Sequence, residues 1–286
     1  MSSTESRTRL RALLRSDRCV LMASVYEPLS ARIAQSLGCE ASLMGGSLAS
    51  LAVLGAPDLI VITLSELAEQ VRRCTRVSNV PLVVDGDHGY GNALNVMRTI
   101  QELDAAGAAA VSIEDTLLPR AFGAGDGPQL VSLAEGAGRV AAAVEARGKD
   151  GPLVLGRTSA ASLTGVDDAL ARLVAYEKAG ADALMIPGVA SREVLERVAA
   201  ATTLPLVVGG LPAALCDPTY LASQRARLWS GGHQTVNAGI QALHDAMKAV
   251  HEGTLAATLP GVASGATMRA LTGADGYDAA AQRYLA

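Results

Sequence analysis

Aromatic residues are scarce in this sequence, and positive charge is not in excess. Aromatic residues account for 3% of the 286 residues, and the formal net charge at pH 7 is −4. Proteins that bind nucleic acid usually present a basic surface and stack bases on aromatic side chains. The composition therefore argues against nucleic acid as a partner.

Lysine and paired cysteine are scarce as well. None of the three lysines lies at the end of an apolar strand pattern, where an enzyme that forms a Schiff base needs a desolvated amine. The four cysteines include no CxxC pair, which argues against a disulfide framework or a structural zinc site and indicates a reducing compartment. Neither lysine nor paired cysteine is therefore expected to form the functional site.

No segment has the composition of a membrane span. The longest apolar run, 43–64, is interrupted by glycines, a proline and Asp58, a combination that a bilayer-spanning helix rarely tolerates. The Ser- and Arg-rich start of the chain places Leu10, Leu13 and Leu14 at helical spacing, which predicts an amphipathic helix rather than a targeting peptide. We therefore expect a cytoplasmic protein without a membrane partner.

Short apolar strands alternate with helical patterns along the whole sequence. Several strands follow a helix that ends in a small residue and glycine, and others begin at Pro81, Pro152 and Pro205. These runs lack a two-residue alternation, as expected for strands buried on both faces of a parallel sheet. Eight such units predict an α/β fold, a TIM-type (β/α)8 barrel, formed by one domain over residues 1–286 with a C-terminal helical extension. A doubly wound Rossmann sheet is the alternative, but its glycine fingerprint is missing.

Carboxylates gather at two of the predicted strand ends, where a TIM barrel places its active site. Asp85 and Asp87 follow the third strand, and Glu114 and Asp115 end the fourth. Mutual repulsion of these groups would be relieved by a hard divalent cation, Mg²⁺ or Mn²⁺, which prefers oxygen ligands. The sequence thus predicts a metal site, although the aspartates alone could be turn and cap residues.

Three other strand ends carry polar side chains that suit an anionic substrate. Arg157 ends the fifth strand, where its guanidinium could bind a substrate carboxylate or pair internally with Asp85 or Glu114. Ser47 follows two glycines after the second strand, and His233 follows two glycines after the eighth. Both could reach a ligand in the mouth of the barrel.

These residues form motifs that resemble the isocitrate lyase/phosphoenolpyruvate mutase superfamily. The motifs are DGDHGYGN at 85–92, SIEDT at 112–116 and GRT at 156–158. Within the superfamily, the sequence is most similar to the oxaloacetate decarboxylase branch. The stretches that support this are 45–50, 89–98, 113–119 and 232–233.

The resemblance implies decarboxylation of oxaloacetate, an α-keto dicarboxylate, to pyruvate and CO₂ through a metal-stabilised enolate. The implied Mg²⁺ site consists of Asp85 as direct ligand with Asp87 and Glu114 assisting, and Mn²⁺ is an alternative ion. The implied substrate-binding residues are Ser47, Arg157 and His233, of which Arg157 and His233 are also the catalytic candidates. The resemblance further implies an eighth helix exchanged between subunits and a homotetramer built as a dimer of dimers.

The loop after the fourth strand departs from the carbon–carbon lyases of this superfamily. Those enzymes carry a catalytic cysteine there, whereas residues 118–123 contain neither cysteine nor histidine. This disfavours a lyase for a substituted malate. Phosphonopyruvate chemistry on the same scaffold, or a catalytically silent barrel that binds dicarboxylates, stays open. Residues 117–130 contain three glycines, and we expect them to form a lid with Phe122 as its apolar contact.

Overall fold

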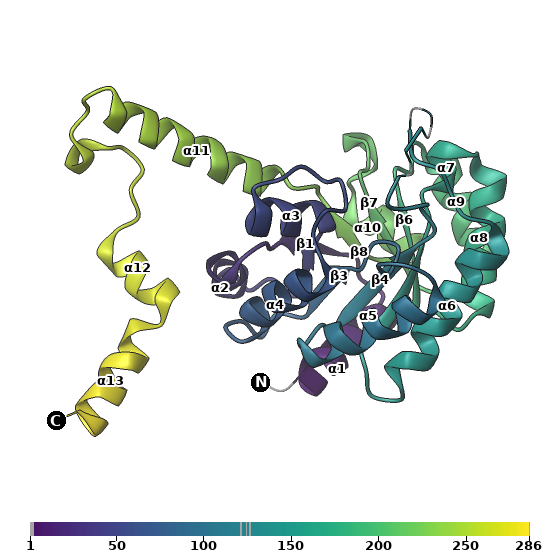
Figure 1. Cartoon of the computed structure of the whole chain (residues 1–286), viewed down its shortest axis with the longest axis horizontal. Coiled ribbons are helices and arrows are strands. Elements are labelled where there is room, and N and C mark those ends of the chain that lie inside the picture. The colour runs from purple at the N-terminus through teal and green to yellow at the C-terminus, as the bar shows by residue number, and fades with distance from the viewer. Residues whose placement is uncertain (1–2, 121, 124, 126, 286) are drawn as a thin grey trace.

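The strands form a closed parallel barrel in sequence order (Figure 1). The computed structural model describes residues 3–120, 122–123, 125 and 127–285. The strands are β1 Val20–Ser24, β2 Ser42–Met44, β3 Leu82–Asp85, β4 Ala110–Glu114, β5 Leu153–Arg157, β6 Ala183–Pro187, β7 Leu206–Gly209 and β8 Ala226–Ser230. Parallel pairing of β8 with β1 closes the barrel. The predicted TIM-type fold is confirmed.

Helices surround the barrel and connect its strands. They are α1 Ser3–Arg15, α2 Pro28–Ser36, α3 Gly46–Leu54, α4 Leu64–Thr75, α5 Ala93–Ala105, α6 Leu133–Arg147, α7 Ala160–Leu163, α8 Val166–Lys178, α9 Arg192–Ala201 and α10 Pro218–Ser223. The C-terminal helices are α11 Gln234–His251, α12 Gly265–Thr272 and α13 Ala274–Tyr284, and 3₁₀ turns lie at Ala213–Leu215 and Ala256–Thr258. None of the described helices combines the length and apolarity needed to cross a membrane.

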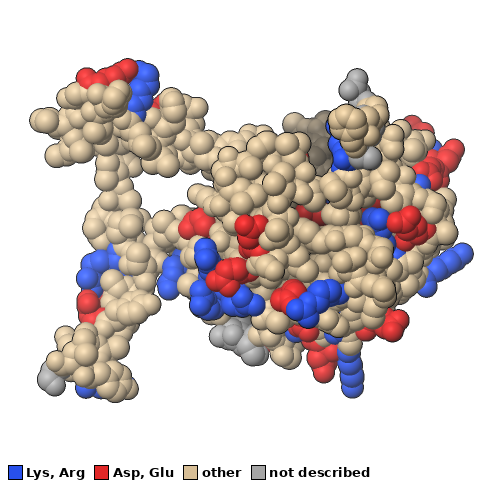
Figure 2. Space-filling model, in the orientation of Figure 1, with Lys and Arg blue, Asp and Glu red and all other residues tan. Residues whose placement is uncertain are grey.

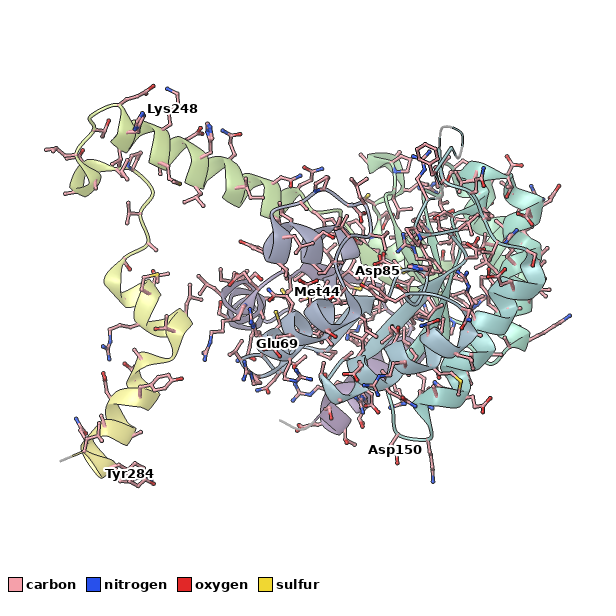
Figure 3. The ribbon with its side chains drawn as sticks, viewed as in Figure 1. Met44, Glu69, Asp85, Asp150, Lys248 and Tyr284 are labelled. Atoms are coloured by element: carbon pink, nitrogen blue, oxygen red, sulfur yellow. The ribbon has the colours of Figure 1, made fainter. Side chains whose placement is uncertain are left out.

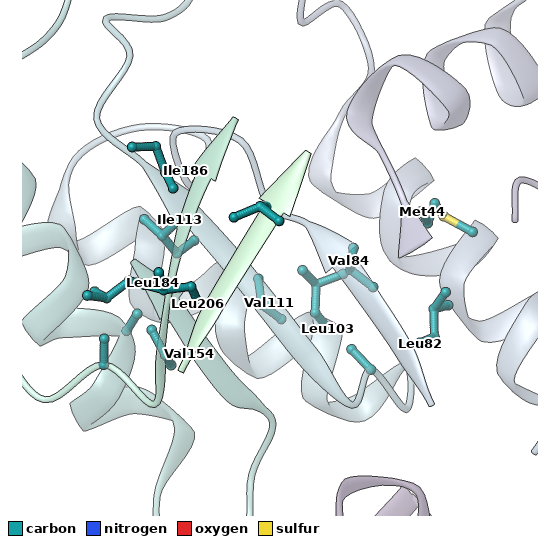
Figure 4. Packing of buried hydrophobic residues seen from close by; sticks show 14 of the residues in the cluster. Met44, Leu82, Val84, Leu103, Val111, Ile113, Val154, Leu184, Ile186 and Leu206 are labelled. Carbon is teal, nitrogen blue, oxygen red and sulfur yellow. The ribbon is translucent and has the colours of Figure 1, made fainter. Parts of the chain in front are cut away.

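The core has two layers, because each strand buries side chains on both of its faces. Between the strands and the outer helices, Leu103 of α5 belongs to the same cluster as Val84 and Val111 (Figure 4). Inside the barrel, Leu10 of α1 is fully buried in a cluster with Leu155 of β5. The predicted amphipathic helix thus packs under the barrel interior.

Residues 234–285 form a segment that we name the C-terminal arm. It leaves the barrel along α11 (Figure 1), and its α12 returns to contact α2. Val236 is the only residue in the arm's described helices that is buried. Figure 2 shows an arm surface that is largely uncharged. Exchange of this arm with another subunit stays a prediction.

Candidate active site

Arg157 joins the carboxylates at the ends of β3 and β4. Its Nη1 donates to Oδ2 of Asp85, and its Nη2 lies 3.1 Å from Oε2 of Glu114. The register explains this proximity, because Asp85 pairs with Ser112 and Glu114 pairs with Arg157 along neighbouring strands. The sequence allowed two roles for Arg157, binding of a substrate carboxylate or internal pairing with Asp85 or Glu114. In this structure Arg157 makes the internal ion pairs.

Asp85 lies at the end of β3 in the barrel (Figure 3) and is held as an ionised carboxylate. Its Oδ1 accepts hydrogen bonds from Ser112 Oγ at 2.9 Å and from the backbone N–H of Asp87 at 3.3 Å. Burial alone would raise the pKa of Asp85, but the charge and the hydrogen bond of Arg157, with the bonds from Ser112 and Asp87, leave that pKa below its ordinary value.

Asp87 is buried beside these groups, and none of the basic side chains that the structure describes forms an ion pair with it. Its Oδ2 makes no hydrogen bond. Burial, followed by the charges of Asp85 and Glu114, raises the pKa of Asp87 well above its ordinary value. Burial also raises the pKa of Glu114, although Arg157 opposes the shift. Three carboxylates thus share one guanidinium.

The loop that carries Asp87 is fixed from two sides. The N–H of Gly86 donates to the carbonyl of Ser112 at 3.0 Å, and the N–H of Glu114 donates to the carbonyl of Asp87 at 2.9 Å. On the other side, a Cβ atom added at Gly46 would lie 2.7 Å from Oδ1 of Asp87. Only glycine allows the start of α3 to approach the carboxylate so closely.

The carboxylate cluster fits a hard divalent cation in charge and in donor type. A cation that keeps several waters needs only one or two direct carboxylates. Within the described part of the chain, no three His, Cys, Asp or Glu side chains lie close enough together to hold a metal ion by themselves. The cluster therefore suits one direct ligand, with the other carboxylates acting through water. The assignment of Asp85, Asp87 and Glu114 to a metal stays a prediction.

Ser47 and His233 lie together on another side of the mouth. A Cβ atom added at Gly45 would lie 3.0 Å from Nε2 of His233 and 3.5 Å from Oγ of Ser47. The junctions β2–α3 and β8–α11 therefore bring both predicted residues to one place, although their binding of substrate stays untested. Burial lowers the pKa of His233, and the negative charges of Asp85 and Asp58 oppose this shift.

Asp58 was not among the residues predicted for the site. It lies in the loop after α3 and is exposed to solvent. Burial and the charge of Asp85 raise its pKa, whereas the charges of Arg157 and His233 lower it. Because Asp58 follows a helix rather than a strand, a search of strand ends does not find it. The feature of the sequence that could have pointed to Asp58 is its place as an isolated acid within the apolar run 43–64.

Comparisons with known proteins identify the family of this chain. A profile of the family described as phosphoenolpyruvate phosphomutase matches residues 10–251. The chain belongs to this family. An oxaloacetate decarboxylase of Paraburkholderia xenovorans (strain LB400) is 58% identical over 286 residues, which is 100% of this chain and 96% of the relative. An oxaloacetate decarboxylase of Rhodopseudomonas palustris (strain BisA53) is 50% identical over 285 residues, which is 100% of this chain and 98% of the relative.

Solved structures are similar to this chain over its whole length. A phosphonopyruvate hydrolase in complex with oxalate and Mg²⁺ superposes with a TM-score of 0.86 at 27% identity and covers 100% of both chains. A 2,3-dimethylmalate lyase described as a member of the PEP mutase/isocitrate lyase superfamily has a TM-score of 0.86 at 26% identity and covers 97% of this chain and 98% of its own. Together with the family match, this confirms the superfamily predicted from the motifs.

Asp115 does not join the carboxylate cluster, contrary to the expectation from its place at the strand end. Its Oδ2 accepts hydrogen bonds from Nη1 of Arg172 at 3.0 Å and from the hydroxyl of Tyr176 at 2.5 Å, both on α8. Successive residues of a strand point to opposite faces. Since Glu114 faces the mouth, Asp115 faces the helices.

Backbone hydrogen bonds join the two ends of the expected lid, residues 117–130, next to the barrel. The N–H of Leu117 donates to the carbonyl of Gln129 at 2.7 Å, and the N–H of Val131 donates to the carbonyl of Asp115 at 2.8 Å. Phe122, the only phenylalanine of the chain, is fully exposed. Closure of this loop over the site stays a prediction.

Proposed function

We propose that this chain is a carboxy-lyase that decarboxylates oxaloacetate to pyruvate and CO₂ with a bound divalent cation. The observation that carries the proposal is the buried cluster in which Asp85, Asp87 and Glu114 share the single guanidinium of Arg157. The full-length similarity to relatives named oxaloacetate decarboxylase supports the substrate.

Asp85 is the candidate for direct contact with the cation, since its carboxylate stays ionised despite burial. Asp87 and Glu114 would act through water. Mg²⁺ suits this oxygen-rich site, the related phosphonopyruvate hydrolase structure contains Mg²⁺, and Mn²⁺ has similar preferences. When bound, the cation supplies Lewis-acid polarisation of the keto oxygen of the substrate.

The two carboxylates of oxaloacetate would find donors in Ser47 and Arg157. Ser47 offers a hydroxyl beside the first N–H groups of α3, which begins at Gly46 and leaves these groups without partners inside the helix. Arg157 already pairs with Asp85 and Glu114, but its Nε has no hydrogen-bond partner. Both residues would hold the substrate in one orientation, which lowers the entropic part of the barrier.

No protein base is needed to break the carbon–carbon bond. The ketone of oxaloacetate is β to the departing carboxylate, so the electrons released with CO₂ pass to the keto oxygen. This explains how a loop without cysteine or histidine at 118–123 suffices for decarboxylation. His233 lies at the mouth, where it would contact the reacting part of the substrate.

A comparison of substrates tests the proposed reaction against its alternatives. With Mg²⁺ present, we expect kcat/KM for oxaloacetate to exceed that for phosphonopyruvate and for 2,3-dimethylmalate by at least about a hundredfold, because each alternative leaves polar groups of the site unmatched. Initial rates measured by coupled detection of the products give the comparison. A higher kcat/KM for either alternative would contradict the assignment, and binding of oxalate without turnover of any substrate would support a silent barrel.

The exposed stripe on the C-terminal arm supports assembly by exchange of α11. Ile240, Leu243, Met247 and Val250 lie along one face of this helix and are 42–66% exposed. The barrel in turn leaves Leu21 of β1 50% exposed on its outer face, where an eighth helix would normally pack. In the proposal, one barrel domain donates α11 to its neighbour, and two such dimers form a tetramer.

The four cysteines are free in the structure. This supports a reducing compartment such as the cytoplasm.

A further inference from the structure

The two ring nitrogens of His233 face different surroundings. Nδ1 lies 3.1 Å from Oγ of Ser24. Nε2 points toward Gly45, because a Cβ atom added there would lie 3.0 Å from it. Ser24 is the last residue of β1, which pairs with β8, and β8 ends at Ser230, three residues before His233. The closure of the barrel thus brings the serine to the histidine.

A second contact of Ser24 determines which nitrogen carries the hydrogen. The hydroxyl donates to the carbonyl oxygen of Gly232 at 3.0 Å. A carbonyl oxygen can only accept, and a serine hydroxyl has a single hydrogen to give. With this hydrogen given to Gly232, Oγ of Ser24 is left as an acceptor toward His233, and Nδ1 would be the donor.

We infer that Ser24 is a positioning residue that fixes neutral His233 in its Nδ1–H tautomer and turns a hydrogen-bond-accepting Nε2 into the mouth of the barrel. The role of a histidine nitrogen is commonly set by the hydrogen bond that the other nitrogen makes. In this tautomer, neutral His233 cannot donate to the keto oxygen of a substrate. Nε2 is the one ring atom that gains or loses a proton.

The consequence for the reaction rests on the proposed decarboxylation. Loss of CO₂ leaves the enolate of pyruvate, which needs one proton on its methylene carbon. When His233 is protonated, the Nε2–H bond breaks as the new C–H bond forms, and the ring returns to its Nδ1–H tautomer without turning. Solvent water then supplies the next proton to Nε2. Ser24 accepts from Nδ1 in both states of the ring.

The tautomer can be measured in the full chain without substrate. Histidine is labelled with ¹⁵N, and two-bond ¹H–¹⁵N correlations at about pH 8, where the imidazole is neutral, report which nitrogen is protonated. The signals of His233 are assigned by their loss in His233→Gln. We expect Nδ1–H in the wild type and in Ser24→Thr, and a loss of this preference in Ser24→Ala.

The matched control removes a serine hydroxyl from the neighbouring strand β2. Ser42 Oγ donates to the carbonyl of Pro81 at 3.1 Å and belongs to a buried strand residue. Ser42→Ala should leave the His233 signals unchanged. An Nε2–H tautomer in the wild type would overturn the inference.

The same variants separate positioning from substrate binding. We expect Ser24→Ala to lower kcat about two- to tenfold, as the loss of one hydrogen bond would, with a smaller change in KM. Ser24→Thr should restore kcat, and Ser42→Ala should not alter it. If Ser24→Ala kept both the tautomer and the kcat of the wild type, the inference would be overturned. Absence of oxaloacetate turnover in the wild type would instead contradict the proposed function, because the tautomer measurement needs no turnover.

Discussion

Replacement of Asp85 by Asn is expected to lower kcat/KM for oxaloacetate about a thousandfold or more. Asp85 Oδ1 accepts from Ser112 and from the backbone of Asp87, while Oδ2 accepts from Arg157. An amide keeps the shape of the carboxylate but removes the charge of the proposed direct cation ligand. Initial rates over a range of oxaloacetate concentrations measure the effect.

The control for this prediction is an aspartate that also pairs with a buried arginine but lies away from the mouth. Asp104 accepts a hydrogen bond from Arg7 at 2.5 Å, and Arg7 is buried. Asp104→Asn should leave kcat/KM close to the wild-type value. Thermal unfolding of both variants tests whether they are folded. If folded Asp85→Asn kept kcat/KM within about tenfold of the wild type, the proposed ligand would be wrong.

Two charges placed on the apolar stripe of α11 are expected to abolish the tetramer. Leu243 and Met247 are 61% and 66% exposed in the single chain. In the proposed assembly their side chains are buried by another subunit, where two unpaired carboxylates cost several kcal/mol each. The mass of Leu243→Glu/Met247→Glu, measured by light scattering, should fall from four times 29.2 kDa toward that of one chain.

The matched control adds negative charge to the opposite face of the same helix. Gln241 and Lys248 lie on the exposed polar side, where Gln241 bonds Asp245 and Lys248 pairs with Glu252. Gln241→Glu/Lys248→Glu should keep the wild-type mass. A wild-type chain that is monomeric at micromolar concentration would contradict subunit exchange, and a stripe variant with unchanged mass would show that assembly uses another surface.

The strand ends that carry the site could be read from the sequence. Asp85, Glu114 and Arg157 are the final residues of β3, β4 and β5, because apolar runs in a parallel sheet end where polar residues reach the barrel mouth. The stripe of Leu10, Leu13 and Leu14 likewise predicted the buried face of α1. These features depend on local pattern and on the general geometry of the fold.

Other features depend on tertiary contacts that the sequence pattern does not encode. A shift of one residue along a strand reverses the direction of a side chain, which is why Asp115 faces α8 instead of the mouth. Asp58 acts on the charges of the site from a loop. The pairing of Arg157 with both Asp85 and Glu114 required the register between three strands.

The most direct test of the central claim is the rate of pyruvate formation from oxaloacetate with Mg²⁺, after EDTA treatment, and after Mg²⁺ is restored. Asp85→Asn protein under the same conditions serves as the background, because free Mg²⁺ itself promotes this decarboxylation. We predict saturable turnover that is lost with EDTA, regained with Mg²⁺ and absent from the variant. Turnover that EDTA leaves unchanged, or that does not exceed the Asp85→Asn background, would contradict cation-dependent decarboxylation at this site.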